Sequence, residues 1–312
     1  MRHTAWPIVL LIGLTACFAT ISCDRRPAAA RNSAAHRKIA SLVPAATDML
    51  LGMGAGDHLV AVSNFETAPQ VKDLPRVGDY ESTDWETLAR LRPDAMIVQI
   101  APDRLPPGLT ARAGELGIEV VNVRIERLED VFDNIQRLGA VAGEVDKGRD
   151  ATRKMRDRLD AVRERCAGRP AVSTLLVRDE NGREVVGPGT FLDDLLKVAN
   201  ATNAAASLAN RYPSIDREKL LSLRPQAVVV LLPGAKPATL DASAGFWASM
   251  TDVPAVRDRR VYTITAPYAL LPGPRLADLA EQLADDLHPD TTTRPSATTP
   301  PATQPTPAPA PK

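Results

Sequence analysis

The chain contains two copies of one segment. Residues 82–98 read STDWETLARLRPDAMIV and residues 214–230 read SIDREKLLSLRPQAVVV, with nine identical positions and no gap. The offset of 132 residues is far longer than the units of roughly 20–50 residues that stack in solenoids. It fits two similar lobes, each about as large as a small domain. Because clefts between domains are where small ligands bind, the duplication predicts two lobes with a ligand cleft between them.

Strands and helices alternate through residues 37–143 and again through residues 168–288. The expected strands are 39–43, 59–62, 95–99, 118–123, 171–177, 227–232 and 261–265, and the expected helices are 47–53, 85–91, 109–116, 129–142, 191–198, 217–223 and 274–287. Pro44 and Ala45 are expected to turn the chain before the first helix. Such alternation is typical of a mainly parallel sheet covered on both faces. We therefore expect an α/β fold of two Rossmann-like lobes.

Residues 144–167 separate the two lobes and have a different pattern. Small or apolar residues recur there every three or four positions, which predicts an amphipathic helix of roughly 35 Å at 1.5 Å per residue. Gly168 and Pro170 follow it, as expected at a helix end. This single long helix is expected to join the lobes, and Cys166 on its apolar face should be a buried, unreactive thiol. The stripe consists of Val145, Gly148, Thr152, Met155, Leu159, Val162 and Cys166.

The two ends of the chain have other compositions. Residues 1–17 begin with a positive charge, continue with an apolar core and end in Leu14-Thr15-Ala16-Cys17, which resembles the lipobox of bacterial lipoproteins. The apolar run is too short to span a membrane and is typical of a signal peptide. We expect Cys17 to be lipidated and to anchor the protein at the periplasmic or cell-surface side of a membrane. Cys23 is a second candidate, and an ordinary secretory signal is the alternative.

Two segments are expected to lack a packed core. Residues 18–36 should be a flexible tether. Residues 289–312 are rich in Pro, Thr and Ala, cannot bury enough apolar surface to offset chain entropy, and should be a disordered tail.

Composition argues against several functions. The chain of 312 residues has 38 basic and 38 acidic side chains, so it lacks the basic excess of a nucleic-acid-binding protein. The four histidines are scattered, and their spacing argues against a histidine-rich zinc site. Spacing does not test ligands that are distant in the sequence and that only the fold brings together. No G-x-S-x-G motif with a suitable histidine is present. We therefore expect neither an enzyme nor a resident metal or cofactor.

Four segments together resemble one known family. They are RKIASLVPAATDMLLGMGAGDHLVAVSNFETAP, DLPRVGDYESTDWETLARLRPDAMIV, SIDREKLLSLRPQAVVVL and GPRLADLAEQLADDL. They are similar to the periplasmic binding proteins for cobalamin and iron chelates, the class III solute receptors of ABC importers, over residues 37–288. The resemblance implies two lobes joined by one rigid helix and limited closure on the ligand. It also implies a monomer that delivers a metal chelate to a permease dimer with its ATPase.

Glu86 and Glu218 occupy equivalent places in the two copies, each in the first turn of an expected helix. The resemblance implies that one glutamate on each lobe docks into arginines of the permease. The simpler alternative is a favourable interaction with the helix dipole, and Thr83 and Glu86 also have capping-box spacing. Ile215 replaces Thr83 in the second copy, so capping alone does not explain both glutamates.

The chain has few aromatic residues, namely three Trp, four Tyr and five Phe, and several lie in expected loops. Flat apolar rings are suited to a corrin, a porphyrin or catecholate groups. Tyr80 and Tyr212 immediately precede the two copies. Arg275 is equally consistent with a ligand contact and with a salt bridge, and Trp85 and Trp247 are better explained as core. The expected ligand-binding residues are Phe65, Tyr80, Tyr212, Tyr268 and Arg275.

The chelate itself follows less directly from the sequence. No His or Met is clearly placed as an axial ligand of haem iron, and no strongly basic cleft for an anionic siderophore is apparent. We therefore favour cobalamin or a related corrinoid. The alternatives are a ferric-siderophore or haem receptor of the same family, and a chelate-binding surface protein that works without a transporter.

Overall fold

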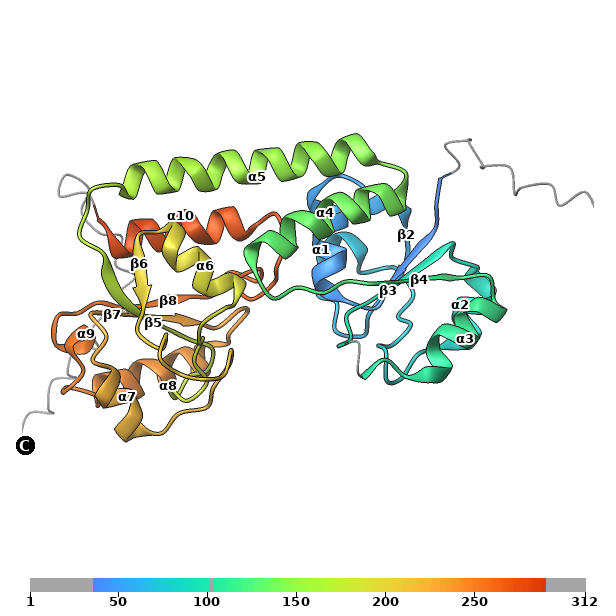
Figure 1. Cartoon of the computed structure of the whole chain (residues 1–312). Coiled ribbons are helices and arrows are strands. Elements are labelled where there is room, and N and C mark those ends of the chain that lie inside the picture. The colour runs from blue at the N-terminus through green and yellow to red at the C-terminus, as the bar shows by residue number, and fades with distance from the viewer. Residues whose placement is uncertain (1–35, 102–103, 290–312) are drawn as a thin grey trace, which may run out of the picture. The chain divides into compact units, whose positions relative to one another are not determined.

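The computed structural model describes residues 36–101 and 104–289, which form two parallel sheets with their helices (Figure 1). The α/β class with two lobes is therefore confirmed. Cys17, Cys23, the tether up to residue 35 and the tail from residue 290 lie outside the described residues, so the expectations for them stay predictions.

The first lobe has a four-stranded sheet in the order β2-β1-β3-β4 with every pair parallel. Its central strands are buried on both faces, which explains why they are mostly apolar. The strands are β1 (Ile39–Ser41), β2 (Leu59–Val62), β3 (Ala95–Val98) and β4 (Glu119–Asn122). The helices are α1 (Pro44–Gly52), α2 (Trp85–Leu91), α3 (Pro107–Glu115) and α4 (Leu128–Ala142), with 3₁₀ turns η1 (Gly56–His58) and η2 (Pro69–Val71).

The second lobe repeats this topology, since its four-stranded parallel sheet has the order β6-β5-β7-β8. The duplicated segment is α2–β3 in one lobe and α7–β7 in the other, so the sequence repeat is also a structural repeat. The strands are β5 (Val172–Val177), β6 (Ala201–Asn203), β7 (Ala227–Leu231) and β8 (Val261–Ile264). The helices are α6 (Phe191–Val198), α7 (Arg217–Leu223), α8 (Pro237–Ala248), α9 (Pro254–Arg257) and α10 (Leu276–Leu287).

The two repeat helices begin with the same cap. The carboxylate of Asp84 accepts the amide hydrogen of Thr87 at 2.9 Å, and that of Asp216 accepts the amide hydrogen of Lys219 at 2.7 Å. An aspartate at this position satisfies an amide that the helix leaves without a partner. Thr83 is therefore not the cap that its spacing indicated, and its hydroxyl donates instead to the carbonyl of Asp79 at 2.6 Å.

The long helix α5 (Val145–Cys166) packs against α4 and against α10 (Figure 1). Most of its predicted apolar stripe is buried, including Cys166. Val145 is an exception, at 42% exposed, because it lies in the first turn, at the end of the contact. Gly148 of α5 lets α4 approach closely, since a Cβ added at Gly148 would lie 3.1 Å from the carbonyl oxygen of Ile135 in α4.

Sequence patterns missed β6, α8 and α9, among other elements, and misplaced several helix starts, including those of α1 and α10. Helix α1 begins at Pro44, where a turn was expected, because proline is well suited to the first helical turn. Helix α10 begins at Leu276 instead of Pro274. Strand β6 has only three residues, α9 has four, and the apolar residues of α8 are not gathered on one face.

Within residues 36–101 and 104–289, no helix combines the length and the apolar character needed to cross a membrane.

Candidate functional site

In each lobe the parallel strands bring their carboxyl ends to one edge of the sheet, and open α/β sheets bind ligands at that edge. Phe65 lies shortly after β2, and Tyr268 shortly after β8. Arg178 directly follows β5. Two of the five expected ligand residues are thus placed at the carboxyl edge by the sheet topology itself.

Phe65 is the most exposed large apolar side chain among the described residues, at 68%. Its amide donates to the hydroxyl of Ser63 at 3.1 Å, which fixes the turn that follows β2. An exposed phenylalanine ring gains about 25 cal/mol per Å² when a ligand covers it. Its position and exposure fit an apolar wall for a flat ligand.

Tyr80 lies in a tight turn that Asp79 organises. The carboxylate of Asp79 accepts the amide hydrogens of Glu81 and Ser82, each at 2.8 Å. The Tyr80 ring packs partly against the first-lobe core. The charge of Glu81, followed by its hydrogen bond, raises the pKa of the Tyr80 hydroxyl above its usual value, so this phenol stays protonated.

Tyr212 holds the equivalent position in the second lobe and is 40% exposed. The guanidinium of Arg178 lies 4.5 Å from the centre of its ring, a distance at which a cation is attracted to an aromatic face. Burial of the hydroxyl raises the pKa of Tyr212. The buried Nε of Arg178 has no hydrogen-bond partner among the described residues, so one donor beside Tyr212 is available.

A cluster of charges connects the two carboxyl edges. Glu126, which follows β4, accepts a hydrogen bond from Arg211 of the other lobe at 2.6 Å. Its other oxygen accepts from Arg124 at 2.8 Å. Arg211 directly precedes Tyr212, so this ion pair brings an expected ligand residue of one lobe close to the last strand of the other.

Tyr268 and Arg275 form a second connection. The guanidinium of Arg275 lies 5.0 Å from the centre of the Tyr268 ring and forms an ion pair with Asp48 of α1. Arg275 therefore makes the salt bridge that the sequence left open, although 41% of its side chain remains exposed. Burial raises the pKa of the Tyr268 hydroxyl.

The two glutamates of the repeat are exposed, and among the described residues neither forms an ion pair. Because crossover helices run antiparallel to the strands that they connect, the first turns of α2 and α7 lie toward the carboxyl edges. Glu86 and Glu218 therefore lie toward the carboxyl edges, where Phe65 and Tyr268 also lie.

The two tryptophans that the sequence assigned to the core are buried to different degrees. Trp247 is 3% exposed and belongs to the core as expected, and Trp85 is partly buried.

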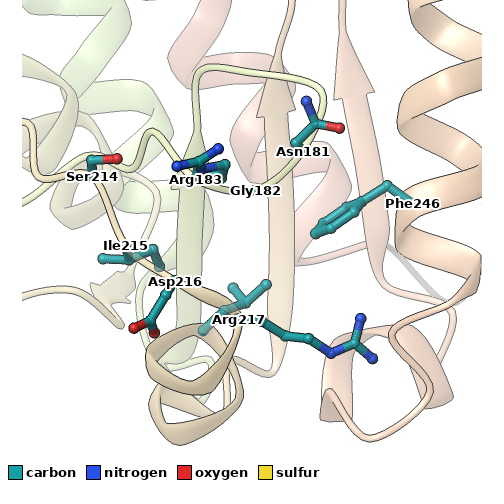
Figure 2. A pocket seen from close by; sticks show the side chains of 9 residues that line it. Asn181, Gly182, Arg183, Ser214, Ile215, Asp216, Arg217 and Phe246 are labelled. Carbon is teal, nitrogen blue, oxygen red and sulfur yellow. The ribbon is translucent and has the colours of Figure 1, made fainter.

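A pocket of about 560 Å³ lies beside the first turn of α7 (Figure 2). The sequence did not indicate it. Its walls come from the second lobe alone, with the ring of Phe246 facing Ile215 and with two arginines that form no ion pair among the described residues, Arg183 and Arg217. The pocket is next to Glu218 and is distinct from the expected cleft between the lobes, which stays a prediction.

Comparisons with known proteins agree on one family. The model of a family described as periplasmic binding protein matches residues 39–268. The vitamin B12-binding protein of Vibrio cholerae serotype O1 is 27% identical over 88% of this chain and 96% of its own length. An uncharacterised ABC transporter substrate-binding lipoprotein of Bacillus subtilis is 26% identical over 82% of this chain and 81% of its own. A solved periplasmic heme binding protein of Pseudomonas aeruginosa aligns with a TM-score of 0.68 at 27% identity, covering 81% of this chain and 93% of that one.

Proposed function

The chain belongs to the periplasmic binding protein family, whose model spans residues 39–268, and from this premise we propose that it is the receptor of an ABC importer for cobalamin or a related corrinoid. It captures its cargo between the two carboxyl edges and releases it to a permease without changing it chemically. The family is one of solute-binding proteins, which supports the expectation that the chain has no catalytic activity.

The preference for a corrinoid rests on the aromatic residues at the carboxyl edges. Phe65, Tyr80, Tyr212 and Tyr268 offer flat or apolar surface, which a macrocycle covers well. Haem iron takes a His, Cys, Met or Tyr from the protein. The pKa of each of the three tyrosines is raised in the absence of a metal, so ferric iron would have to displace a tightly held phenolic proton.

The positions of the histidines also favour a corrinoid over haem. His288 hydrogen-bonds the carbonyl of Ala199 at 2.9 Å, and His36 and His58 lie before β1 and β2, away from the carboxyl edge. A corrinoid carries a nitrogen ligand of its own, so a site without a protein ligand to the metal is suited to it. Haem is the second candidate, favoured by the likeness to the heme binding protein of Pseudomonas aeruginosa, and a ferric siderophore is the further alternative.

Glu86 and Glu218 are proposed to dock the receptor on its permease. The two carboxylates are exposed, unpaired among the described residues, and located in equivalent turns of the two lobes. A permease dimer with two-fold symmetry presents two equivalent surfaces, and paired charges across an interface fix orientation more than affinity. Because both glutamates lie toward the carboxyl edges, a cargo held at those edges would face the permease.

Lipidation at Cys17 would hold the receptor at the membrane. The relative from Bacillus subtilis is described as a lipoprotein, which supports this part of the proposal. A diacylglycerol with a further acyl chain exceeds the single chain that binds membranes only weakly. Mass spectrometry of the mature N-terminus would distinguish lipidated Cys17, lipidated Cys23 and an ordinary secretory cleavage.

Titration of the purified protein with cobalamin, cobinamide, haem and a ferric siderophore, followed by visible absorbance and calorimetry, tests the choice of cargo. We expect one equivalent of corrinoid to bind at least about 100-fold more tightly than the other chelates, equal to roughly 2.7 kcal/mol. Tighter binding of haem or of the siderophore would replace the corrinoid by that cargo. Saturation by none of them would remove the receptor proposal.

A further inference from the structure

Two histidines that are far apart in the sequence meet at the amino edge of the first sheet. His36 precedes β1, and His58 ends η1 directly before β2. Their rings are stacked, with centres 4.3 Å apart and planes inclined by 16°. Together with Asp57, each offers one ligand atom within 4.8 Å of the other two. This edge is opposite the carboxyl edge, so the cluster is separate from the proposed cargo site.

The hydrogen bonds of the two rings fix which nitrogen carries a proton. A carbonyl oxygen can only accept, so the His36 Nε2 that lies 2.9 Å from the Asp57 carbonyl must donate a hydrogen. The His58 Nδ1 that lies 2.9 Å from the Arg37 carbonyl must donate as well. In the neutral rings, His36 Nδ1 and His58 Nε2 therefore carry lone pairs. Histidines that bind metals donate their other ring N–H in this way to carbonyls or carboxylates.

Each lone-pair nitrogen has a carboxylate oxygen close to it. His36 Nδ1 lies 3.8 Å from Asp57 Oδ2, and His58 Nε2 lies 3.5 Å from Glu144 Oε1. These distances are at or beyond the limit of a hydrogen bond. They are close to the separation of about 3.3 Å between neighbouring ligands around a tetrahedral ion with bonds of about 2.05 Å.

Glu144 lies beside this cluster and is already paired. Its Oε1 is 3.5 Å from Nε2 of His58 and accepts a hydrogen bond from Lys147 at 2.9 Å. His58 itself is only 4% exposed. The ligand atoms that lie within 4.8 Å of one another therefore come from His36, Asp57 and His58.

We propose that His36, Asp57 and His58 bind a divalent transition-metal ion, with Zn²⁺ as the best match. Two imidazole nitrogens with a carboxylate suit zinc, whereas Ca²⁺ and Mg²⁺ prefer oxygen ligands alone. The ion would join the segment before β1 to the turn before β2. It would stabilise the place where the chain enters the first lobe, independently of cargo.

The test uses the full chain after treatment with a chelator. Calorimetry and equilibrium dialysis with ZnCl₂ should show one saturable site, and zinc should raise the melting temperature because it binds only the folded form. The exposed ligand His36 is the first to change: His36→Asn and Asp57→Asn should each weaken zinc binding at least about 10-fold while leaving corrinoid affinity unchanged. The matched control is Asp146→Asn in α5, whose carboxylate is fully exposed, and it should bind zinc like the wild type.

Co²⁺ offers a second measurement that does not depend on stability. The visible absorption of tetrahedral Co²⁺ should appear with the wild type and be lost in His36→Asn and in His58→Gln. Failure of the wild type to bind zinc at millimolar concentration would overturn the site, as would unchanged affinity in His36→Asn. Equal binding of Mg²⁺ would also overturn it, because that ion does not prefer imidazole nitrogen.

Discussion

The guanidinium of Arg275, at the start of α10, forms an ion pair with Asp48 of α1, so a charge of one lobe is neutralised by the other. The Asp48 side chain is only 6% exposed, and its Oδ2 has no hydrogen-bond partner among the described residues. Gly273 permits this arrangement, since a Cβ there would lie 2.2 Å from that oxygen. Burial raises the pKa of Asp48, and Arg275 opposes the rise. The pair is therefore a candidate for holding the lobes together.

Arg275→Met should lower the free energy of unfolding by about 3 kcal/mol, because it leaves a buried carboxylate without its partner. The double variant Asp48→Asn/Arg275→Met removes that charge and should recover most of the loss. Urea unfolding at pH 7 measures both. A change below about 0.5 kcal/mol in Arg275→Met would show that the pair contributes nothing to stability.

The same double variant separates the two roles of Arg275. If the Arg275 side chain only bridges the lobes, the corrinoid affinity of the folded double variant should be within about twofold of that of the wild type. If Arg275 also contacts cargo through its exposed part, affinity should fall at least about 10-fold, or roughly 1.4 kcal/mol. We expect a change in corrinoid affinity of no more than about twofold, because the guanidinium of Arg275 is already paired with the carboxylate of Asp48.

Reversal of both repeat glutamates, Glu86→Arg with Glu218→Arg, should leave corrinoid affinity unchanged and abolish uptake in cells. The reversal opposes the helix dipole at each site, at a cost of about 0.3–1 kcal/mol, which a stable protein tolerates. Glu164→Arg is the matched control, because Glu164 is an exposed glutamate of α5. Normal uptake by the double variant would contradict the docking role.

The sequence predicted those parts of the fold that local rules determine. The bounds of β2, α2, α6 and α7 agree with the expectation, because capping residues, prolines and apolar runs mark them clearly. Strand β6 was missed because Ala201–Asn203 is too short for a pattern, and its pairing with β5 decides its conformation. Helix α8 was missed because its small residues give no periodic signal.

The site depends more on contacts that no local pattern shows. Tyr80 and Tyr212 could be singled out because they precede the two copies. The partner of Arg275 lies 227 residues away, and spacing could not connect His36 with His58, because the turn before β2 brings them together. Sequence thus indicates which residues carry chemistry, whereas the fold decides which of them meet.

Asp286 in α10 should make stability depend on pH. Burial first, and the charge of Asp285 second, raise its pKa from 3.8 to about 6. The folded state therefore binds this proton more tightly than the unfolded state, and the free energy of unfolding should fall as pH rises from about 4 to about 6. Asp286→Asn should flatten this decline and raise stability at pH 7 by roughly 1 kcal/mol, after allowance for solvent screening. Asp73→Asn, at an exposed carboxylate, should leave the profile unchanged, and a parallel decline in Asp286→Asn would contradict the assignment.

Substitution of the three tyrosines by Phe and by Ala tests how the cargo is held. Stacking on a macrocycle needs the ring and not the hydroxyl, so Tyr80→Phe, Tyr212→Phe and Tyr268→Phe should keep corrinoid affinity within about threefold. Tyr80→Ala and Tyr212→Ala should each weaken it about 10-fold, since removing an aromatic contact costs roughly 1–1.5 kcal/mol. Calorimetry measures both series. A Tyr→Phe variant that loses affinity as strongly as its Ala counterpart would mean that the hydroxyl itself is needed. Loss of haem absorbance in the same variant would then identify a phenolate bound to iron and favour haem as the cargo.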